Sequence, residues 1–143
     1  MDTKRIGNIG EAMVIAQLVE NEMPVYPAFG DNESADLVAE IRGQLVKIQV
    51  KTCTSLKQDG GSYVVDLRRN KNPWTSTTGS VAYTPKEVDY FATYCTITKQ
   101  ICWFKVSELQ QMSVTLRIQP PQNGATKNIR YESDYSFSKV FGI

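Results

Sequence analysis

The sequence predicts a mixed β-sheet flanked by helices, in an α/β or α+β domain. Three observations predict this class. A segment with helical periodicity opens the chain, the two strongest strands follow it as a hairpin, and several shorter strands come after them. The length of 143 residues suits a single domain. We expect its core to span about residues 1–105, with a more irregular C-terminal region over residues 106–143.

The first predicted element is a helix from Thr3 to Glu20. Asp2 or Thr3 can cap its N-terminus, and Pro24 stops its continuation. Gly7 and Gly10 should each cost about 1 kcal/mol of helix stability relative to alanine. They indicate either a close approach by another backbone or a ligand, or a loose first turn. The side chains that recur at helical spacing, and are therefore expected to face the core, are Ile6, Ile9, Met13 and Ala16.

The strands are predicted from alternating or continuous apolar runs bounded by turn residues. Arg42 and Gly43 form a two-residue turn between the two strongest strands. The predicted strands cover residues 25–29, 35–41, 44–52, 62–67, 90–96, 100–106 and 113–118.

The composition excludes several classes of function. The chain has no histidine, which removes histidine-based catalytic triads and most zinc catalysis. Its three cysteines have no zinc-type or redox-type spacing, and reduced thiols fit a cytoplasmic protein. No signal peptide or membrane-spanning apolar run is present in the sequence, which also favours the cytoplasm. Sixteen basic and fifteen acidic residues nearly cancel, so a nucleic-acid surface would need segregated charge.

The hairpin brings three polar side chains to one face. With a two-residue turn at positions 42–43, Asp36 lies opposite Gln49, with Cβ atoms about 5 Å apart. Lys51 shares the face of Gln49 because side chains alternate along a strand. The other face carries Val46, Ile48 and Val50, which should pack on the core. Carboxylate and amide oxygens suit a hard cation such as Mg²⁺. The lysine can stabilise charge on a phosphate or hold an attacking water.

These residues resemble the pattern of the PD-(D/E)XK nucleases. That pattern has a glutamate on a helix, an aspartate on one strand, and an acid, any residue and a lysine on the next. Here it reads Gly10-Glu11, Ala35-Asp36 and Gln49-Val50-Lys51. The opening segment, residues 6–12, is similar to the first helix of the superfamily's junction resolvases and intron endonucleases. In its size and its glutamine, the chain is most similar to the cyanobacterial type of group I intron homing endonuclease.

The resemblance implies a restriction-endonuclease-like core and a metal-dependent endonuclease that hydrolyses phosphodiester bonds in double-stranded DNA. It implies Glu11, Asp36, Gln49 and Lys51 as catalytic residues. Glu11, Asp36 and the backbone carbonyl of Val50 would hold Mg²⁺ or another hard divalent cation. Two positions depart from the pattern. Ala35 replaces a proline, and Gln49 replaces an acid, which weakens the case for two tightly held metal ions.

The densest basic cluster supplies candidate DNA contacts. Arg68, Arg69 and Lys71 lie in a polar segment over residues 68–80, and such side chains commonly contact phosphates. A solvated loop is the alternative interpretation. Cutting both strands of a duplex needs two sites, so we expect a homodimer or a dimer of dimers. The apolar residues 90–104 are the expected source of that interface, unless the domain buries them in its own core.

Four functions fit these residues. A sequence-specific intron homing endonuclease is the first. A restriction-type or Holliday-junction-resolving nuclease would share the chemistry on a different DNA shape. A catalytically silent DNA-binding module of the same fold and a structural or assembly protein are the others. Metal-dependent nicking of DNA separates the first two from the last two.

Overall fold

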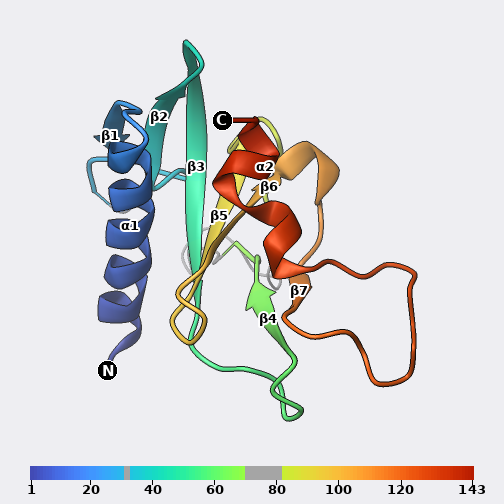
Figure 1. Cartoon of the computed structure of the whole chain (residues 1–143). Coiled ribbons are helices and arrows are strands. Elements are labelled where there is room, and N and C mark those ends of the chain that lie inside the picture. The colour runs from blue at the N-terminus through green and yellow to red at the C-terminus, as the bar shows by residue number, and fades with distance from the viewer. Residues whose placement is uncertain (31–32, 70–81) are drawn as a thin grey trace.

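The computed structural model of the protein describes residues 1–30, 33–69 and 82–143. The chain order begins with a long helix and continues through a β-sheet, as predicted (Figure 1). Lys71 and the other residues of the ranges 31–32 and 70–81 lie outside the described part of the chain. Within that described part, no helix is both long and apolar enough to cross a membrane.

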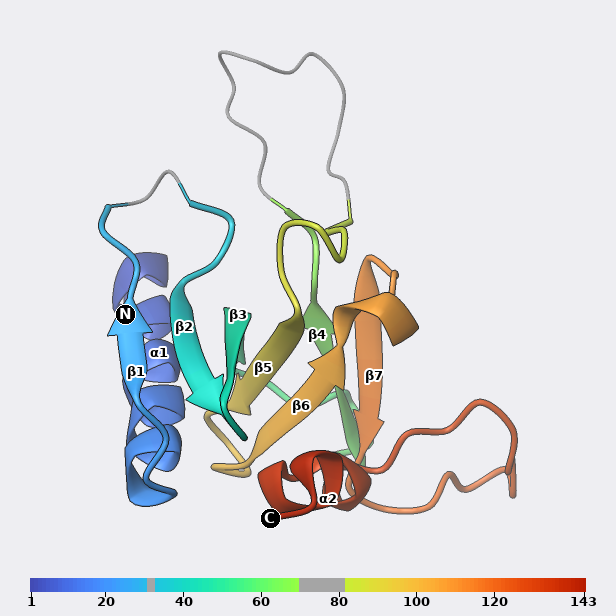
Figure 2. The same ribbon diagram turned by 90° about the horizontal axis from the view of Figure 1, so that it is seen from above.

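The main sheet has five strands in the order β1-β2-β3-β5-β6. β3 and β5 run parallel, whereas the other neighbours are antiparallel, so the sheet is mixed. Figure 2 shows this sheet from above, with the helix α1 (Thr3–Glu20) on one side of it and the pair β4 (Ser62–Asp66) and β7 (Ser113–Arg117) on the other. The strands are β1 (Val25–Pro27), β2 (Leu37–Ile41), β3 (Gln44–Cys53), β5 (Tyr90–Cys95) and β6 (Ile101–Lys105).

The turn between β2 and β3 confirms the predicted register. Arg42 and Gly43 have φ of 53° and 78°, the left-handed values that a tight two-residue hairpin turn requires. Leu37 consequently pairs with Ile48, and Asp36 lies one residue before the strand, at the level of Gln49. The alternate side chains Val46, Ile48 and Val50 are buried, as the strand pattern predicts.

The helix α1 has the predicted bounds, Thr3–Glu20, but a different buried face. Asp2 caps it by accepting the N–H of Arg5 at 2.8 Å. The prediction that Met13 and Ala16 face the core is wrong, since both are exposed, while Ile6 and Ile9 are half-buried. The buried face consists instead of Gly10, Val14 and Leu18.

The close contact at Gly10 explains which face of α1 is buried. A Cβ at Gly10 would meet Thr52 Oγ1 at 2.0 Å and Val50 Cγ1 at 3.4 Å. The absence of a side chain therefore lets the helix backbone rest directly on β3, which confirms the predicted close approach at this glycine. Nothing lies within 4 Å of a Cβ built at Gly7, so the first of the two glycines has no such role.

The C-terminal region contains the strand predicted at residues 113–118 and a short helix that was not predicted. β7 (Ser113–Arg117) pairs antiparallel with β4 (Ser62–Asp66) in a second, two-stranded sheet. The short helix α2 (Phe137–Phe141) begins at the cap Ser136 and ends at Gly142, which is left-handed at φ 68°. Two 3₁₀ turns, η1 (Val106–Glu108) and η2 (Glu132–Tyr135), join these elements.

The main sheet has a separate core on each face. α1 and α2 cover one face, where Val14, Leu18, Trp103 and Phe137 are buried together. The β4–β7 sheet covers part of the other, where its residues pack on Phe91 and Phe104. Gln49, Lys51 and Asp36 belong to this second face, because their neighbours at alternate positions face α1.

Residues 90–104 do not form the exposed interface that was expected. Phe91, Cys95, Trp103 and Phe104 are each at most 3% exposed, because the two cores enclose them from both faces of the sheet. The alternative, burial in the domain's own core, is therefore the observed one. Within this range Ile97 is the exposed large apolar side chain, at 54%.

Candidate active site

The candidate site forms where β3 continues beyond its neighbour β2. β2 begins at Leu37, opposite Ile48, so within the described chain no strand pairs with this edge of β3 beyond Ile48. The N–H of Val50 lies on that open edge and donates to Asp36 Oδ2 at 2.8 Å. Asp36 is thus anchored at the start of β2 by both its backbone, whose N–H donates to Ile48 O at 2.9 Å, and its carboxylate.

Asp36 carries its charge in a half-buried position. Burial raises the pKa of the Asp36 carboxyl above its usual value, although the hydrogen bond from Val50 and the charge of Lys51 both act to lower it. A partly desolvated carboxylate of this kind gains strongly from a nearby cation. The position therefore favours binding of a positive ion.

Gln49 lies beside the same open edge. Its Nε2 donates to the carbonyl of Val50 at 3.4 Å, a long and therefore weak hydrogen bond. The carbonyl of Val50, the amide of Gln49 and the carboxylate of Asp36 thus form one connected polar group. Turning the amide of Gln49 by half a turn would direct its oxygen, in place of its NH₂, towards the same space.

Glu11 lies on α1, directly after the glycine that contacts β3. Gly10 of this helix approaches Thr52 and Val50, which lie on the α1 side of β3, whereas Asp36, Gln49 and Lys51 belong to the opposite face. Glu11 is half-buried. The hairpin thus brings Asp36, Gln49 and Lys51 together, while the part of Glu11 in the site stays a prediction.

These groups fit a hard divalent cation. They offer oxygen ligands, namely the carboxylate of Asp36, the Val50 carbonyl and the Gln49 amide. Among the described residues, no three His, Cys, Asp or Glu side chains gather closely enough to hold a metal by themselves. Mg²⁺ suits such a sparse set, because it commonly binds one or two carboxylates and keeps several waters.

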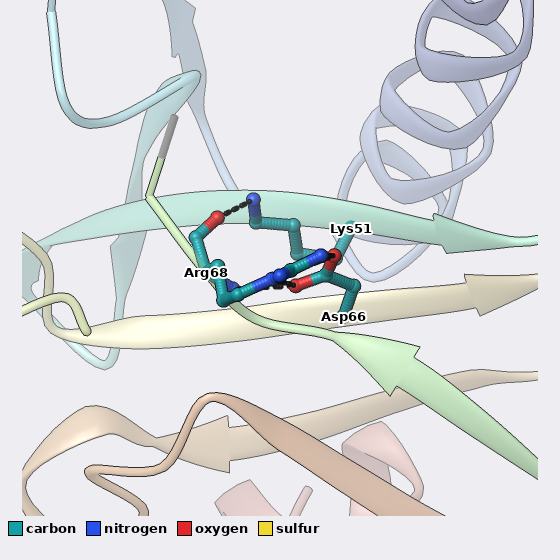
Figure 3. Close-up of polar contacts among 3 residues, drawn as sticks. All are labelled: Lys51, Asp66 and Arg68. Carbon is teal, nitrogen blue, oxygen red and sulfur yellow. Dashed lines mark hydrogen bonds and ion pairs between the residues drawn. The ribbon is translucent and has the colours of Figure 1, made fainter. Parts of the chain in front are cut away.

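Lys51 is held on the other side of Asp36. Its Nζ donates to the backbone carbonyl of Arg68 at 2.8 Å (Figure 3). Burial lowers the pKa of the Lys51 ammonium, and the charges of Asp66 and Asp36 oppose that shift. The ammonium also lies 5.3 Å from the centre of the Tyr83 ring, within range of a cation–π interaction.

Two residues that the sequence did not single out, Asp66 and Tyr83, contribute to the site. Tyr83 is 7% exposed and packs edge-on against Phe91. Burial and the charge of Asp36 raise its pKa to about 12, so its hydroxyl stays protonated. Neither residue is close in sequence to Lys51, which is why no local motif could identify them.

The candidate DNA-binding arginines flank the site and already have partners. Arg68 forms a bidentate ion pair with Asp66, and Arg69 forms an ion pair with Glu87. Glu87 is fixed in turn by Ser34 Oγ at 3.2 Å and Thr84 Oγ1 at 3.1 Å. A phosphate that binds either arginine must therefore share it with a carboxylate.

Comparison with known proteins agrees with this arrangement. A family model described as PD-(D/E)XK endonuclease matches residues 1–138. Nucleases of this family use divalent metal ions, and a nuclease of this kind binds DNA. No curated protein gives a significant match.

Among solved structures, the fold is similar to that of a bacterial homing endonuclease, I-Ssp6803I. The TM-score is 0.75 at 24% sequence identity, and the match covers 94% of this chain and 88% of the other. The family match extends over nearly the whole sequence, and the solved structure shares the fold. The chain therefore belongs to the PD-(D/E)XK endonuclease family.

Proposed function

We propose that this endonuclease uses Mg²⁺ to cut double-stranded DNA at a specific sequence, as an intron homing enzyme. The observation that carries the proposal is the meeting of Asp36, the Val50 carbonyl, Gln49 and Lys51 at the open edge of β3. The likeness to a bacterial homing endonuclease over 94% of this chain supports the homing type. We further propose that the chain works as one catalytic domain.

The site residues have separate roles in the proposed cleavage reaction. Asp36, Glu11 and the carbonyl of Val50 would hold the cation, with Gln49 as a weaker additional ligand. When bound, the cation supplies Lewis-acid polarisation of the scissile phosphate and makes water a better nucleophile. The ammonium of Lys51 stabilises negative charge that develops on the phosphate oxygens, or orients the attacking water. Its position next to Asp36 suits both tasks.

Cleavage assays on two DNA shapes test this function. We expect the protein to cut linear duplex DNA containing its target at fixed positions in the presence of Mg²⁺, and to stop when a chelator removes the metal. Preference for four-way junctions over linear duplex would assign a junction-resolving nuclease. Binding of DNA without cleavage under any divalent metal would indicate a catalytically silent module and refute the proposal.

Replacement of Gln49 tests its part in metal binding. Gln49→Glu should keep cleavage within about tenfold and tighten metal affinity, because a carboxylate is the better ligand for a hard cation. The new side chain also no longer donates to the Val50 carbonyl. Gln49→Ala should be more harmful. Gln44→Glu, which adds the same charge at the exposed start of β3, is the control. Equal apparent metal affinity for the wild type and Gln49→Glu would argue against direct coordination.

We propose that Arg68, Arg69 and Lys71 contact the DNA. Each phosphate contact that is removed should lower the slope of log affinity against log salt by about 1. Alanine replacement of all three should therefore flatten the salt dependence measured by fluorescence anisotropy. Lys139→Ala, on the exposed surface of α2, is the control. A triple variant with the salt dependence of the wild type would rule out this placement of the DNA.

We also propose a homodimer or a dimer of dimers. One chain offers one Glu11–Asp36–Gln49–Lys51 site, whereas concerted cutting of two strands needs two sites in fixed relation. A single small module also buries only about 600–1,000 Å² on DNA, which is little for a long target. Sedimentation equilibrium should give a multiple of the 16.1 kDa chain mass. A monomer with and without DNA would indicate a nickase instead.

A further inference from the structure

A short turn at the end of β4 approaches the candidate catalytic lysine. Asp66 is the last residue of β4, and its Oδ1 accepts the backbone N–H of Arg68 at 2.9 Å. The same carboxylate accepts Arg68 Nε at 2.9 Å and Nη2 at 2.6 Å. Asp66 therefore fixes both the backbone and the side chain of the residue two positions later, as Figure 3 shows.

The turn presents its carbonyl to Lys51. Lys51 Nζ, on β3 of the main sheet, donates at 2.8 Å to the carbonyl of Arg68, which follows β4 of the second sheet. A lysine has a flexible stem of four carbons, so the position of its ammonium depends on what holds the far end. Here a backbone carbonyl of the 66–68 turn and the ring of Tyr83, 5.3 Å from Nζ, hold that end.

We infer that Asp66 is a positioning residue for DNA cleavage, which acts by holding the 66–68 turn so that the Arg68 carbonyl fixes the Lys51 ammonium. This inference rests on the proposed function, because it assigns Lys51 to the chemistry. Asp66 acts through Arg68, and no contact between Asp66 and substrate is required. A small displacement of a catalytic group can lower a rate by about 100-fold, so a turn that removes such freedom matters for catalysis.

Because the Asp66–Arg68 ion pair is exposed, the role of Asp66 in cleavage can be tested without loss of the fold. The side chains of Arg68 and Asp66 are 52% and 57% exposed, and exposed ion pairs of this kind add little to folding stability. A loss of cleavage on changing Asp66 would therefore not be a loss of the fold. The melting temperature of each variant checks this point.

Two substitutions of Asp66 distinguish the effect of the hydrogen bond that holds the turn from the effect of the negative charge on Asp66. Asp66→Asn keeps an oxygen that can accept the Arg68 N–H, whereas Asp66→Ala removes the acceptor. With enzyme in excess over DNA and saturating, we expect the single-turnover cleavage rate to fall by about tenfold or more in Asp66→Ala and by less than about threefold in Asp66→Asn.

A matched control lies at the other end of the same strand. Asp59 Oδ1 accepts the N–H of Gly61 at 2.8 Å, and Asp59 pairs with Arg117, so it makes an equivalent turn away from Lys51. Asp59→Ala should leave the cleavage rate unchanged. Cleavage by Asp66→Ala at the wild-type rate would overturn the inference. So would an equal loss in Asp66→Asn and Asp66→Ala, since the charge and not the turn would then be responsible.

A measurement without substrate separates this inference from the proposed function. The NMR signal of the Lys51 ammonium, assigned by its absence in Lys51→Ala, should show slowed hydrogen exchange in the wild type and in Asp66→Asn. In Asp66→Ala it should exchange rapidly. If that pattern holds while the wild type cuts no DNA, the positioning is correct and the proposed function is wrong. If the ammonium exchanges equally in all three proteins, the positioning is wrong whatever the activity.

Discussion

Asp36→Asn is expected to lower the rate of DNA cleavage at least about 100-fold while leaving most DNA binding intact, in line with other losses of electrostatic stabilisation at active sites. Asparagine keeps an oxygen that can accept the N–H of Val50, so the anchor at the start of β2 survives. It removes the negative charge that would hold the cation. Single-turnover cleavage and a gel-shift assay measure the two effects separately.

The same variant should fold at least as stably as the wild type at neutral pH. Burial raises the pKa of Asp36 above its usual value of 3.8, so the ionised carboxylate destabilises the folded state at any pH above that raised pKa. Removing the charge removes this penalty. The advantage of Asp36→Asn should disappear as the pH falls through the raised pKa to below 3.8, because the wild-type carboxyl is then protonated in both states.

Thermal melts at neutral and acid pH test this second expectation. Glu40→Gln is the matched control, since Glu40 lies on β2, four residues after Asp36 and at an alternate position of the same face, but away from the open edge of β3. Near-normal cleavage by Asp36→Asn would show that this carboxylate does not hold the cation.

The sequence was sufficient for the part of the site that depends on local geometry. A two-residue turn with a glycine fixes the register of a hairpin, and strand alternation then decides which side chains share a face. Asp36, Gln49 and Lys51 were placed together by these two rules alone, and the register is confirmed. The family was also predictable, because its motif lies on this hairpin and the preceding helix.

The buried face of α1 was not predictable by periodicity alone. The helix carries apolar side chains around most of its circumference, so Ile6, Ile9 and Met13 form as regular a series as Val14 and Leu18. The decision depends on Gly10, where the helix rests against Thr52. The glycine indicated a close approach, but only the fold shows which strand approaches.

The surroundings of Lys51 depend on long-range pairing. Asp66 reaches the lysine because β4 pairs with β7, which is about 50 residues further along the chain. Neither Asp66 nor Tyr83 belongs to a motif, and their roles come from the packing of the second sheet against the first. Helix α2, only five residues long, was missed because one turn is too short to show a helical period.

Lys51→Ala should reduce cleavage at least about 100-fold, because it removes the positive charge that stabilises the phosphate in the transition state. It also leaves the half-buried carboxylate of Asp36 without the neighbouring ammonium that helps to keep it ionised. DNA affinity should change little, since a single ammonium deep in the site is one contact among many. Lys51→Ala cleaving at close to the wild-type rate would remove this lysine from the chemistry.

Lys47→Ala is the control that makes this result specific. Lys47 lies on the same strand and the same face as Lys51, but its Nζ donates to the carbonyl of Lys86, at 2.7 Å, rather than to Arg68. The two variants therefore lose the same side chain from positions four residues apart on one strand. We expect Lys47→Ala to cleave at nearly the wild-type rate. Equal losses in the two variants would mean that positive charge along this face of β3 assists DNA binding in general, and that Lys51 has no special part in the reaction.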